Sequence, residues 1–370
     1  MSDLGGVGVT LSSNQSSGTN KMNDSTNCDH HDPSGHVFFM LVYSLVFLVG
    51  ILLNGFTLKV YFCRAQQTSS SVTIYLKNLA AADFLISLCL PIRIMKFASS
   101  SVPVHQVYCN FGASAFYLNM YASILFMGYI AANRYLKIVH PLGTHVLQTV
   151  RAAHVLSTLT WVFLLTMMGA YILLSLLTQE PLPSVHVTGS CDVLHSQQLS
   201  LLYKIIHSCS ATIFLLVLIS LICFYYSTTH RLSLAQQRQP VSFSSKKLVK
   251  SRKNMLVLVS VFCICFVPYH LVRLPYAFLR RQCRWSQAFF YLKEMTVMMS
   301  VLNICLDPLI YFIFCKAFRA QLSLRSVLTI TQVAPHAENP ERRTSAGRIS
   351  SIDTNRKTSL STLMKQNSML

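Results

Sequence analysis

The hydrophobic positions of this chain fall into long apolar runs that are separated by short polar segments. Each run is at least as long as the roughly 20 residues that a helix needs to cross the hydrocarbon core of a bilayer. The runs cover residues 37–63, 72–97, 107–138, 153–177, 201–228, 252–279 and 288–314. The pattern therefore predicts an all-α membrane protein with a bundle of seven transmembrane helices.

Composition leaves little material for a soluble domain. Hydrophobic residues make up 52% of the chain and charged residues only 12%, about half the charged fraction of a typical soluble protein. The first 36 residues are polar and lack the apolar core of a cleavable signal peptide. We therefore expect the first apolar run to direct the chain to the membrane.

The net charge of +19 suggests nucleic-acid binding at first, but the distribution of the charge argues against such a partner. Basic residues gather in the segments that follow the first, third, fifth and seventh runs. These segments lie on one side of a seven-span topology, and the positive-inside rule assigns that side to the cytosol. The N-terminus is then extracellular and residues 315–370 are cytosolic.

This topology divides the chain into a membrane domain, 37–315, and three flanking segments. Residues 1–36 are expected to be an extracellular tail. Its glycosylation acceptors are Asn14 and Asn23. Residues 316–328 are typical of a short amphipathic eighth helix on the inner leaflet. Residues 329–370 are predicted to be a disordered cytoplasmic tail, whose repeated basic-then-hydroxyl pattern suits protein kinases but also fits a generic tail.

Four of the twelve cysteines fall on the predicted outer side of the membrane. They are Cys28, Cys109, Cys191 and Cys283. An oxidising compartment favours two disulfides among them. The residues alone leave all three pairings open.

Several polar side chains lie deep inside the apolar runs. They include Asp83, Asn119, Ser123, Asn303 and Asp307. Carboxylates at this depth need partners or hydration, so we expect a shared cluster that binds a small cation, with sodium as the candidate ion. The alternative is a set of unrelated hydrogen bonds that join helices. No other cofactor is indicated.

The sixth run carries both aromatic and cationic residues on one helical face. His270 and Arg273 are three residues apart, and Phe262 and Phe266 continue their face toward the membrane interior. An arginine at membrane depth costs about 2.5–3.5 kcal/mol by insertion scales, so it normally faces the bundle interior or a cavity. This stripe predicts one wall of a pocket for an anionic ligand.

Motifs in successive runs together carry a family resemblance. They are Asn54, Asp83, Cys109, Asn133-Arg134-Tyr135, Trp161, the Phe-x-x-x-Cys-Phe-x-Pro stretch that ends at Pro268, and Asp307-Pro308-x-x-Tyr311. The chain resembles the rhodopsin-like (class A) G-protein-coupled receptors over about residues 37–325. Each motif is weak alone, but their occurrence in order leaves little room for chance. Pro268 and Pro308 also offer places where two neighbouring helices can pivot.

Within that class the chain is most similar to the purinergic nucleotide receptors of the ADP and UDP-sugar subgroup and their orphan relatives. The matching stretches are Ile74–Asn78, Phe116–Tyr121, Phe266–Arg273, Lys293-Glu294 and Cys305–Pro308. The resemblance implies that Cys109 pairs with Cys191 and Cys28 with Cys283. It also implies that Arg273 and Lys293 hold phosphates, while the rest of the ligand site is Tyr117, Tyr121, His207 and His270.

The resemblance further implies a cell-surface receptor that activates a heterotrimeric G protein and performs no catalysis. The residues expected to act in activation are Asn133, Arg134, Tyr135, Tyr225, Phe266, Pro268, Asp307, Pro308 and Tyr311. Arrestin and receptor kinases are the partners expected for the tail. The ligand is expected to be a nucleotide or nucleotide sugar. The alternatives are a lysophospholipid receptor of the same fold and, less favoured, a seven-span transporter.

The chain departs from the class pattern at several positions. Asn133 replaces the acid that usually precedes Arg134. The resemblance therefore does not imply that signalling without ligand is very low. Phe266 stands where tryptophan is commoner, and Val217 where a proline is usual. Two further cations, Arg93 and Lys96, lie at the outer end of the second run, and the sequence does not settle their role.

Overall fold

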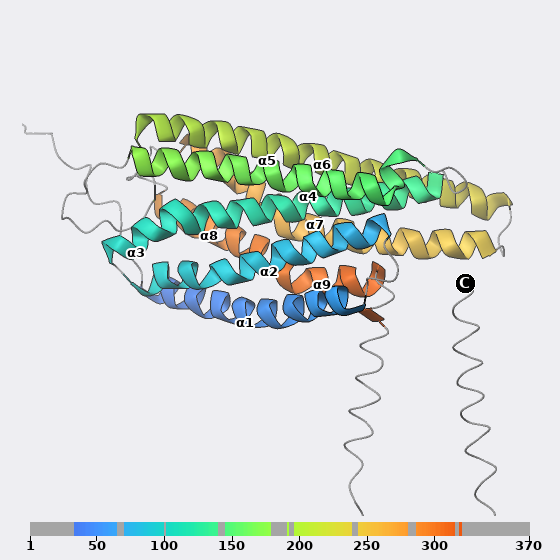
Figure 1. Ribbon diagram of the computed structural model, residues 1–370, viewed down its shortest axis with the longest axis horizontal. Coiled ribbons are helices and arrows are strands. Elements are labelled where there is room, and N and C mark those ends of the chain that lie inside the picture. Colours follow the sequence, from blue (N-terminus) through green and yellow to red (C-terminus); the bar gives the residue numbers. More distant parts are fainter. Residues whose placement is uncertain are drawn as a thin grey trace, which may run out of the picture. The chain divides into compact units, whose positions relative to one another are not determined.

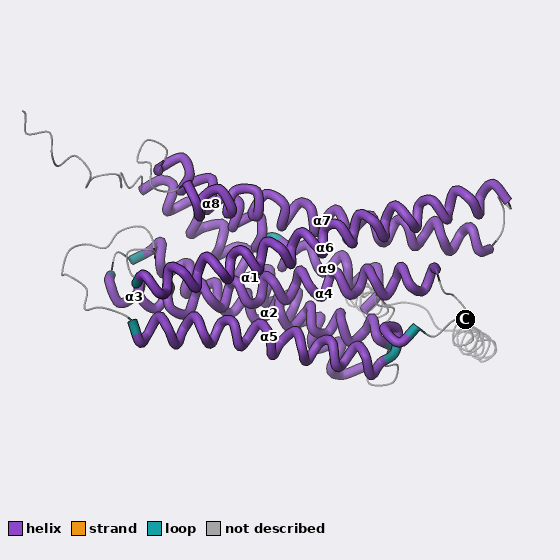
Figure 2. The backbone as a smooth tube through the Cα atoms, turned by 90° about the horizontal axis from the view of Figure 1, so that it is seen from above, coloured by secondary structure: helices purple, strands orange, loops and turns teal. Residues whose placement is uncertain are grey.

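The computed structural model describes residues 33–64, 70–99, 101–139, 145–178, 191, 196–238, 243–279, 286–314 and 318–319. Within these ranges the chain is helical apart from short turns and contains no strand. The helices lie side by side as a bundle (Figure 1, Figure 2). In this part of the chain seven helical segments are long and apolar enough to cross a membrane, which confirms the predicted fold class.

The spans are built from helices of unequal length. They are α1 (Pro33–Arg64), α2 (Ser71–Ala98), α3 (Val102–Val107), η2 (Tyr108–Gly112), α4 (Ala113–Val139), η3 (Val146–Gln148), α5 (Val150–Leu177), α6 (Gln197–Arg238), α7 (Phe243–Leu279), α8 (Ser286–Val301) and α9 (Asn303–Phe314). The third span joins α3, the π-helical turn η2 and α4. The seventh span joins α8 and α9, which meet at Leu302.

Hydroxyl side chains begin two of the spans. The Ser70 hydroxyl accepts a hydrogen bond from the backbone N–H of Thr73 at 3.3 Å, and the Thr149 hydroxyl accepts one from Ala152 at 3.2 Å. Such caps satisfy backbone donors that have no partner within the helix. They fix where α2 and α5 start, just outside the apolar runs.

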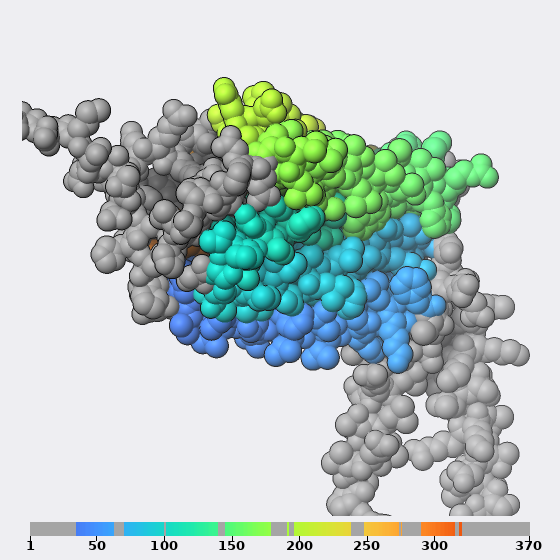
Figure 3. All heavy atoms as spheres, turned by 60° about the vertical axis from the view of Figure 1, so that its left-hand side comes forward, coloured from blue at the N-terminus to red at the C-terminus, as the bar shows by residue number. Residues whose placement is uncertain are grey.

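Helix α4 occupies the centre of the bundle. It contacts α2, α5, α6 and α7, and 67% of the apolar window of its span is buried, against 17% in the windows of α5 and α6. Figure 3 shows one face of the bundle, with α1 in blue, α2 in light blue, part of the third span in teal and α5 in green following one another. Large apolar side chains such as Leu159, Leu173 and Leu216 are exposed, as expected for faces that meet lipid.

A glycine allows α1 to approach α2 and α9 closely. A Cβ atom at Gly50 would lie 2.6 Å from Ile304 Cγ2 and 2.6 Å from Ser87 Oγ, so a larger residue does not fit there. One turn further along, Asn54 Nδ2 donates to the carbonyl of Ile304 at 3.0 Å. This bond holds α1 against α9 just after the break in the seventh span.

The observed helices differ from the predicted runs at their ends. Helices α6 and α7 extend into polar, basic sequence on the predicted cytosolic side, and the third span begins at Val102. The hydropathy pattern marks only the part of a helix that crosses the hydrocarbon core. The predicted runs are therefore shorter than the observed helices. Of the predicted eighth helix, only residues 318 and 319 are described. They are helical, and the Phe318 ring packs against Phe56 and Tyr311 with centroids 5.7 and 6.4 Å apart.

Candidate functional site

A cavity lies between α2, α4, α5, α6, α7 and α8 in the half of the bundle near Cys191. Its polar and aromatic lining includes Arg93, Lys96, Tyr117, Tyr121, Tyr203, His207, Arg273, Lys293 and Glu294. Its apolar lining includes Phe163, Leu164, Met167, Met168 and Ile213. The cavity therefore has cationic and apolar walls, and five of the six residues expected to bind the ligand line it.

Glu294 is the centre of a buried group of charges on the α2 and α8 side of the cavity. Its carboxylate lies 2.5 Å from Arg93, 3.6 Å from Lys96 and 3.4 Å from Lys293, and it is only 1% exposed. Three cations share this one carboxylate, so the group keeps an excess of positive charge. We call Arg93, Lys96, Lys293 and Glu294 the charge cluster.

Aromatic groups hold Arg93 in place within the charge cluster. Its guanidinium donates to the Tyr108 hydroxyl at 2.9 Å. It also lies 5.0 Å from the ring centroid of Tyr43 and 5.4 Å from that of Phe116. A desolvated cation gains about 2 kcal/mol or more from such a ring, which helps to offset the cost of burial. These contacts define the position of the Arg93 side chain.

Arg273 supplies positive charge from the α7 side of the cavity. Its guanidinium donates a hydrogen bond to the hydroxyl of Tyr203 and lies 3.5 Å from Nε2 of His207. It also lies 5.6 Å from the ring centroid of Tyr117. Arg273, His207 and Tyr117 therefore meet as predicted, and Tyr203 is a member of this group that sequence reasoning missed.

His270 does not line the cavity, contrary to the predicted ligand set. Its Nε2 lies 3.0 Å from the hydroxyl of Tyr121, and its Nδ1 lies 2.8 Å from the carbonyl of Phe266. Since a carbonyl can only accept, Nδ1 carries a proton; in the neutral imidazole Nε2 then accepts the proton of Tyr121. The His270 ring also stacks on Phe214 at 3.7 Å between centroids. Tyr121 thus separates His270 from the cavity.

Phe214 and Phe262 continue the stack below His270. Their rings are parallel, with centroids 5.8 Å apart, and Phe262 meets Phe266 edge to face at 5.3 Å. The aromatic side chains that the sequence placed on one face of α7 therefore contact one another. They do not form the predicted pocket wall, because only Arg273 of this face lines the cavity. The rings of His270, Phe214 and Phe262 extend from Tyr121, which lines the cavity, toward the middle of the bundle, and Phe214 of α6 stacks on both other rings.

The deep polar residues gather around Asp83 as the sequence predicted. Asp83 accepts hydrogen bonds from Ser123 at 3.2 Å, Asn303 at 3.4 Å and Tyr311 at 2.6 Å. Asp307 lies next to Asp83, and neither of its carboxylate oxygens receives an N–H or O–H donor from the described residues.

Asn119 lies in the same region. Its amide nitrogen donates to the carbonyl of Ala115, while its buried amide oxygen has no donor within the described part of the chain. Unfilled oxygens of Asn119 and Asp307 beside Asp83 are hard ligands of the kind that a small cation takes. The residues therefore fit the sodium ion that the sequence suggested.

At the predicted cytosolic end, the side chains of the three-residue motif point to different partners. Asn133 donates from Nδ2 to the Ser71 hydroxyl at 2.8 Å. The Arg134 guanidinium lies 4.6 Å from the ring centroid of Phe314, and Tyr135 stacks on Phe224 at 4.8 Å. Asn133 therefore bonds to α2.

The other expected activation residues lie along α6, α7 and α9. Pro268 and Pro308 stand inside α7 and α9. Tyr225 is half-buried on α6, while Tyr311 is buried and donates to Asp83. In this arrangement Tyr311 therefore belongs to the deep polar cluster.

Comparison with known proteins decides the family. The model of the 7 transmembrane receptor (rhodopsin family) matches residues 53–311. The chain belongs to this family. It is 37% identical to purinoceptor 14 of Bos taurus over 292 residues, which cover 76% of this chain and 83% of the relative.

Two other relatives differ in what their names say they bind. Purinoceptor 13 of Homo sapiens is 32% identical over 320 residues, 85% of this chain and 88% of the relative. Lysophosphatidic acid receptor 6 of Gallus gallus is 28% identical over 301 residues, 78% and 93%. The protein is thus a multi-pass plasma-membrane receptor of the G-protein-coupled type and not an enzyme. The membership excludes the seven-span transporter.

One predicted disulfide of the receptor is confirmed. Cys109, in η2, is bonded to Cys191 with an S–S distance of 2.03 Å. Cys28, Cys283, Asn14 and Asn23 lie outside the described residues, so the second disulfide and the glycosylation sites stay predictions.

Sequence reasoning missed the role of Glu294. It quoted Lys293-Glu294 for the resemblance and left Arg93 and Lys96 undecided. A glutamate inside an apolar run was itself a signal, because a buried acid needs a cationic partner. The missing step was the fold, which brings the side chains of Arg93 and Lys96 on α2 to Glu294 on α8.

Proposed function

We propose that this receptor binds an anionic small molecule, a nucleotide or nucleotide sugar, in the cavity between α2, α4, α6, α7 and α8. The observation that carries the proposal is the excess of buried positive charge along the cavity. Arg273 and the three cations of the charge cluster face a single carboxylate, Glu294, among the described lining residues. Buried charge of one sign is costly unless it is paired, and a phosphate would supply the missing negative charge.

The aromatic lining supports a ligand that carries a planar base. Tyr117 and Phe163 line the same cavity as Arg273, and aromatic rings stack on other rings at little conformational cost. The diphosphate of a nucleotide would bind the cations while its base stacks on these rings. The purinoceptor names of two relatives point to the same ligand class.

A lysophospholipid is the second candidate ligand, and the apolar wall is the observation that favours it. Leu164, Met167, Met168 and Ile213 line the cavity, and they suit an acyl chain while the phosphate binds Arg273. One relative is named as a lysophosphatidic acid receptor.

In this proposal the ligand acts by a shift of population toward the active arrangement. The N-terminus is extracellular, so the cavity faces the outside and Arg134 faces the cytosol. Activation moves the inner ends of α6 and α7 outward, with α7 pivoting about Pro268. A second pivot at Pro308 in α9 releases Tyr311 from Asp83. A heterotrimeric G protein then enters the opening beside Arg134, Tyr135 and Tyr225.

The deep polar cluster would hold a sodium ion in the resting receptor. Asp83 and Asp307 supply carboxylate oxygens, and Asn119, Ser123 and Asn303 are neutral ligands at the same site. Two adjacent carboxylates repel each other unless a proton or a cation lies between them, and the ion supplies that charge.

The proposal also includes the ends of the chain. Asn14 and Asn23 would carry glycans, and Cys28 would pair with Cys283. Hydroxyls in residues 329–370 would be phosphorylated by receptor kinases and then bound by arrestin.

A ligand panel tests the proposed function. Cells that express the receptor are exposed to nucleoside diphosphates, UDP-sugars and lysophosphatidic acid, and G-protein activation is measured with the untransfected line as background. Activation by a nucleotide or nucleotide sugar is expected. Activation by lysophosphatidic acid alone would overturn the nucleotide assignment in favour of the second candidate.

A further inference from the structure

At the seam between α5 and α6, two side chains belong both to the cavity lining and to the outer surface of the bundle. Phe163 of α5 and Cys209 of α6 line the cavity, yet Phe163 is 42% exposed and Cys209 is exposed as well. Other lining residues, such as Leu118 and Leu164, are each only 7% exposed. At this seam the cavity wall is therefore a single layer of side chains.

The lining of the seam is apolar. Met167 on α5 and Ile213 on α6 also line the cavity and are half-buried, and together with Phe163 and Cys209 we call them the seam residues. Among the described lining residues, the charged side chains come from α2, α7 and α8. The seam residues therefore offer little to a phosphate and suit a hydrocarbon chain.

The seam residues lie at the depth of the hydrocarbon core. At the rise of an α-helix, Met167 is about 15 Å from the outer end of α5 at Leu177. By the same measure Ile213 is about 18 Å below Leu201, where the apolar run of α6 begins. The hydrocarbon core of a bilayer is about 30 Å thick, so both side chains lie near its middle. The outer surface of the seam therefore meets acyl chains and not water.

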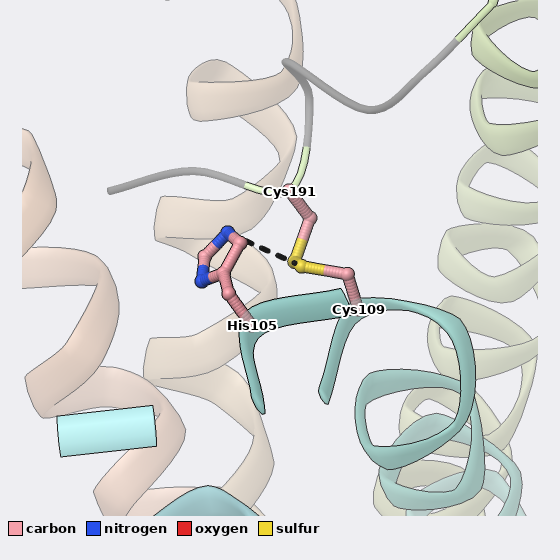
Figure 4. A group of neighbouring side chains, drawn as sticks. All are labelled: His105, Cys109 and Cys191. Carbon is pink, nitrogen blue, oxygen red and sulfur yellow. Dashed lines mark hydrogen bonds between the residues drawn. A yellow bond between two sulfur atoms is a disulfide. The ribbon is translucent and has the colours of Figure 1, made fainter. Parts of the chain in front are cut away.

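The cavity extends from its outer end down to this depth. Cys191 lines the outer end and is bonded to Cys109, beside His105 (Figure 4). Leu118 lies about 13 Å further along the same span as Cys109, at the rise of a helix. A polar ligand from outside thus enters near the disulfide, whereas the seam lies at the opposite, apolar end of the cavity.

An apolar space at this depth favours a hydrocarbon occupant. Water there would lack the polar partners that hold a buried water molecule. An empty gap would deprive the side chains around it of their dispersion contacts on one side. A methylene chain restores those contacts and makes no demand for hydrogen bonds. Such chains are the solvent on the other side of the seam.

We propose that the seam is a lipid-binding portal, through which an acyl chain of a bilayer phospholipid enters the cavity. The chain passes between Phe163 and Cys209 and lies against Leu118 and Leu164. The headgroup stays at the outer membrane surface, near the outer ends of α5 and α6. The site is held by packing alone, and no covalent step is involved.

An acyl chain in the seam would regulate ligand binding. Phe163 is also a proposed stacking partner for the base of a nucleotide, so the chain and the base compete for this ring. An agonist that reaches Phe163 must then displace the chain. The lipid site itself does not require any particular agonist, and it is therefore tested without one.

The occupant is tested on the native receptor by photolabelling. Receptor in nanodiscs that contain phosphatidylcholine with a diazirine on one acyl chain is irradiated, and the labelled residues are mapped by peptide mass spectrometry. Adducts are expected on Leu118 or Leu164 inside the cavity, as well as on lipid-facing residues such as Leu159 and Leu216. Adducts confined to the lipid-facing residues would overturn the proposal. Cavity labelling by a photoreactive sterol and not by the phospholipid would overturn the choice of an acyl chain.

The path of the chain is tested by filling the seam. Ile213→Trp places a larger side chain among the seam residues and should abolish the adducts on Leu118 and Leu164. The matched control is Leu216→Trp, because Leu216 is 62% exposed on the same helix and does not line the cavity. The control should keep the cavity adducts. Cavity adducts that persist in Ile213→Trp, or that disappear in both variants, would show that the chain does not enter by the seam.

Discussion

At the scale of single residues, Asn133 shows how a side chain can depart from its family role. An acid at this position would lie beside the Arg134 guanidinium, whereas the amide of Asn133 donates to Ser71 on α2. Arg134 in turn lies over the ring of Phe314. In this structure Arg134 thus has an aromatic contact in place of an ion pair with its neighbour.

Asn133→Asp should lower ligand-independent signalling. An aspartate still accepts a hydrogen bond from Ser71 and adds a carboxylate beside Arg134, which stabilises the resting state by about 1 kcal/mol for a partly solvated pair. Basal nucleotide exchange is measured in cells with matched surface expression of the two forms, and agonist affinity should change little. Equal or higher basal activity in the variant would show that this position does not set the resting equilibrium.

Some residue roles were accessible from the sequence and others were not. Spacings of four and three residues placed Phe266, His270 and Arg273 on one helical face, and all three lie on α7. Spacing on one helix cannot show which side chain of a neighbouring helix stands in front. Tyr121, from α4, covers His270 and removes it from the cavity lining.

At the scale of helices, the charge cluster joins α2 to α8. Arg93 and Lys96 come from α2, Lys293 and Glu294 from α8, and the pair Arg93–Glu294 is separated by 201 residues in sequence. The apolar runs predicted both helices because a bilayer fixes the length of apolar sequence. The pairing of α2 with α8 depends on the packing of the bundle, for which the sequence carried no direct signal.

Glu294→Gln should destabilise the receptor and make it more dependent on an anionic ligand. Removing one partner from a buried ion pair costs about 3–5 kcal/mol, because the remaining charges stay buried and unpaired. Thermal unfolding in nanodiscs should therefore begin at a lower temperature.

The double substitution Arg93→Met with Glu294→Gln is the matched control, because it removes one charge of each sign. It should recover part of the lost stability. A Glu294→Gln receptor that unfolds like the native one would mean that Glu294 does not neutralise the cluster.

At the scale of the whole molecule, the proposed activation would connect the cavity to the predicted cytosolic face through the deep polar cluster. Tyr311 bonds to Asp83 in this arrangement, and the proposed activation requires that bond to break. A sodium ion between Asp83 and Asp307 would favour the resting bundle, so sodium and agonist should oppose each other reciprocally.

Sodium chloride should therefore lower agonist affinity about fivefold relative to choline chloride at the same concentration. Asp83→Asn removes the carboxylate at the centre of the cluster and should abolish that difference. Affinity is measured by agonist binding to membranes in the two salts. An undiminished sodium effect in Asp83→Asn would place the ion elsewhere.

The central claim is that buried positive charge in the cavity binds an anionic agonist that activates a G protein. The most direct measurement is guanine-nucleotide exchange on a heterotrimeric G protein by purified receptor in nanodiscs, titrated with the nucleotide or UDP-sugar that the panel selects. Arg273→Ala should weaken agonist potency about tenfold or more, since a charge-assisted bond is worth roughly 1.5–3 kcal/mol. Lys204→Ala, which removes an exposed cation one residue from Tyr203, should leave potency unchanged. Native potency in Arg273→Ala, or an equal loss in both variants, would contradict the account.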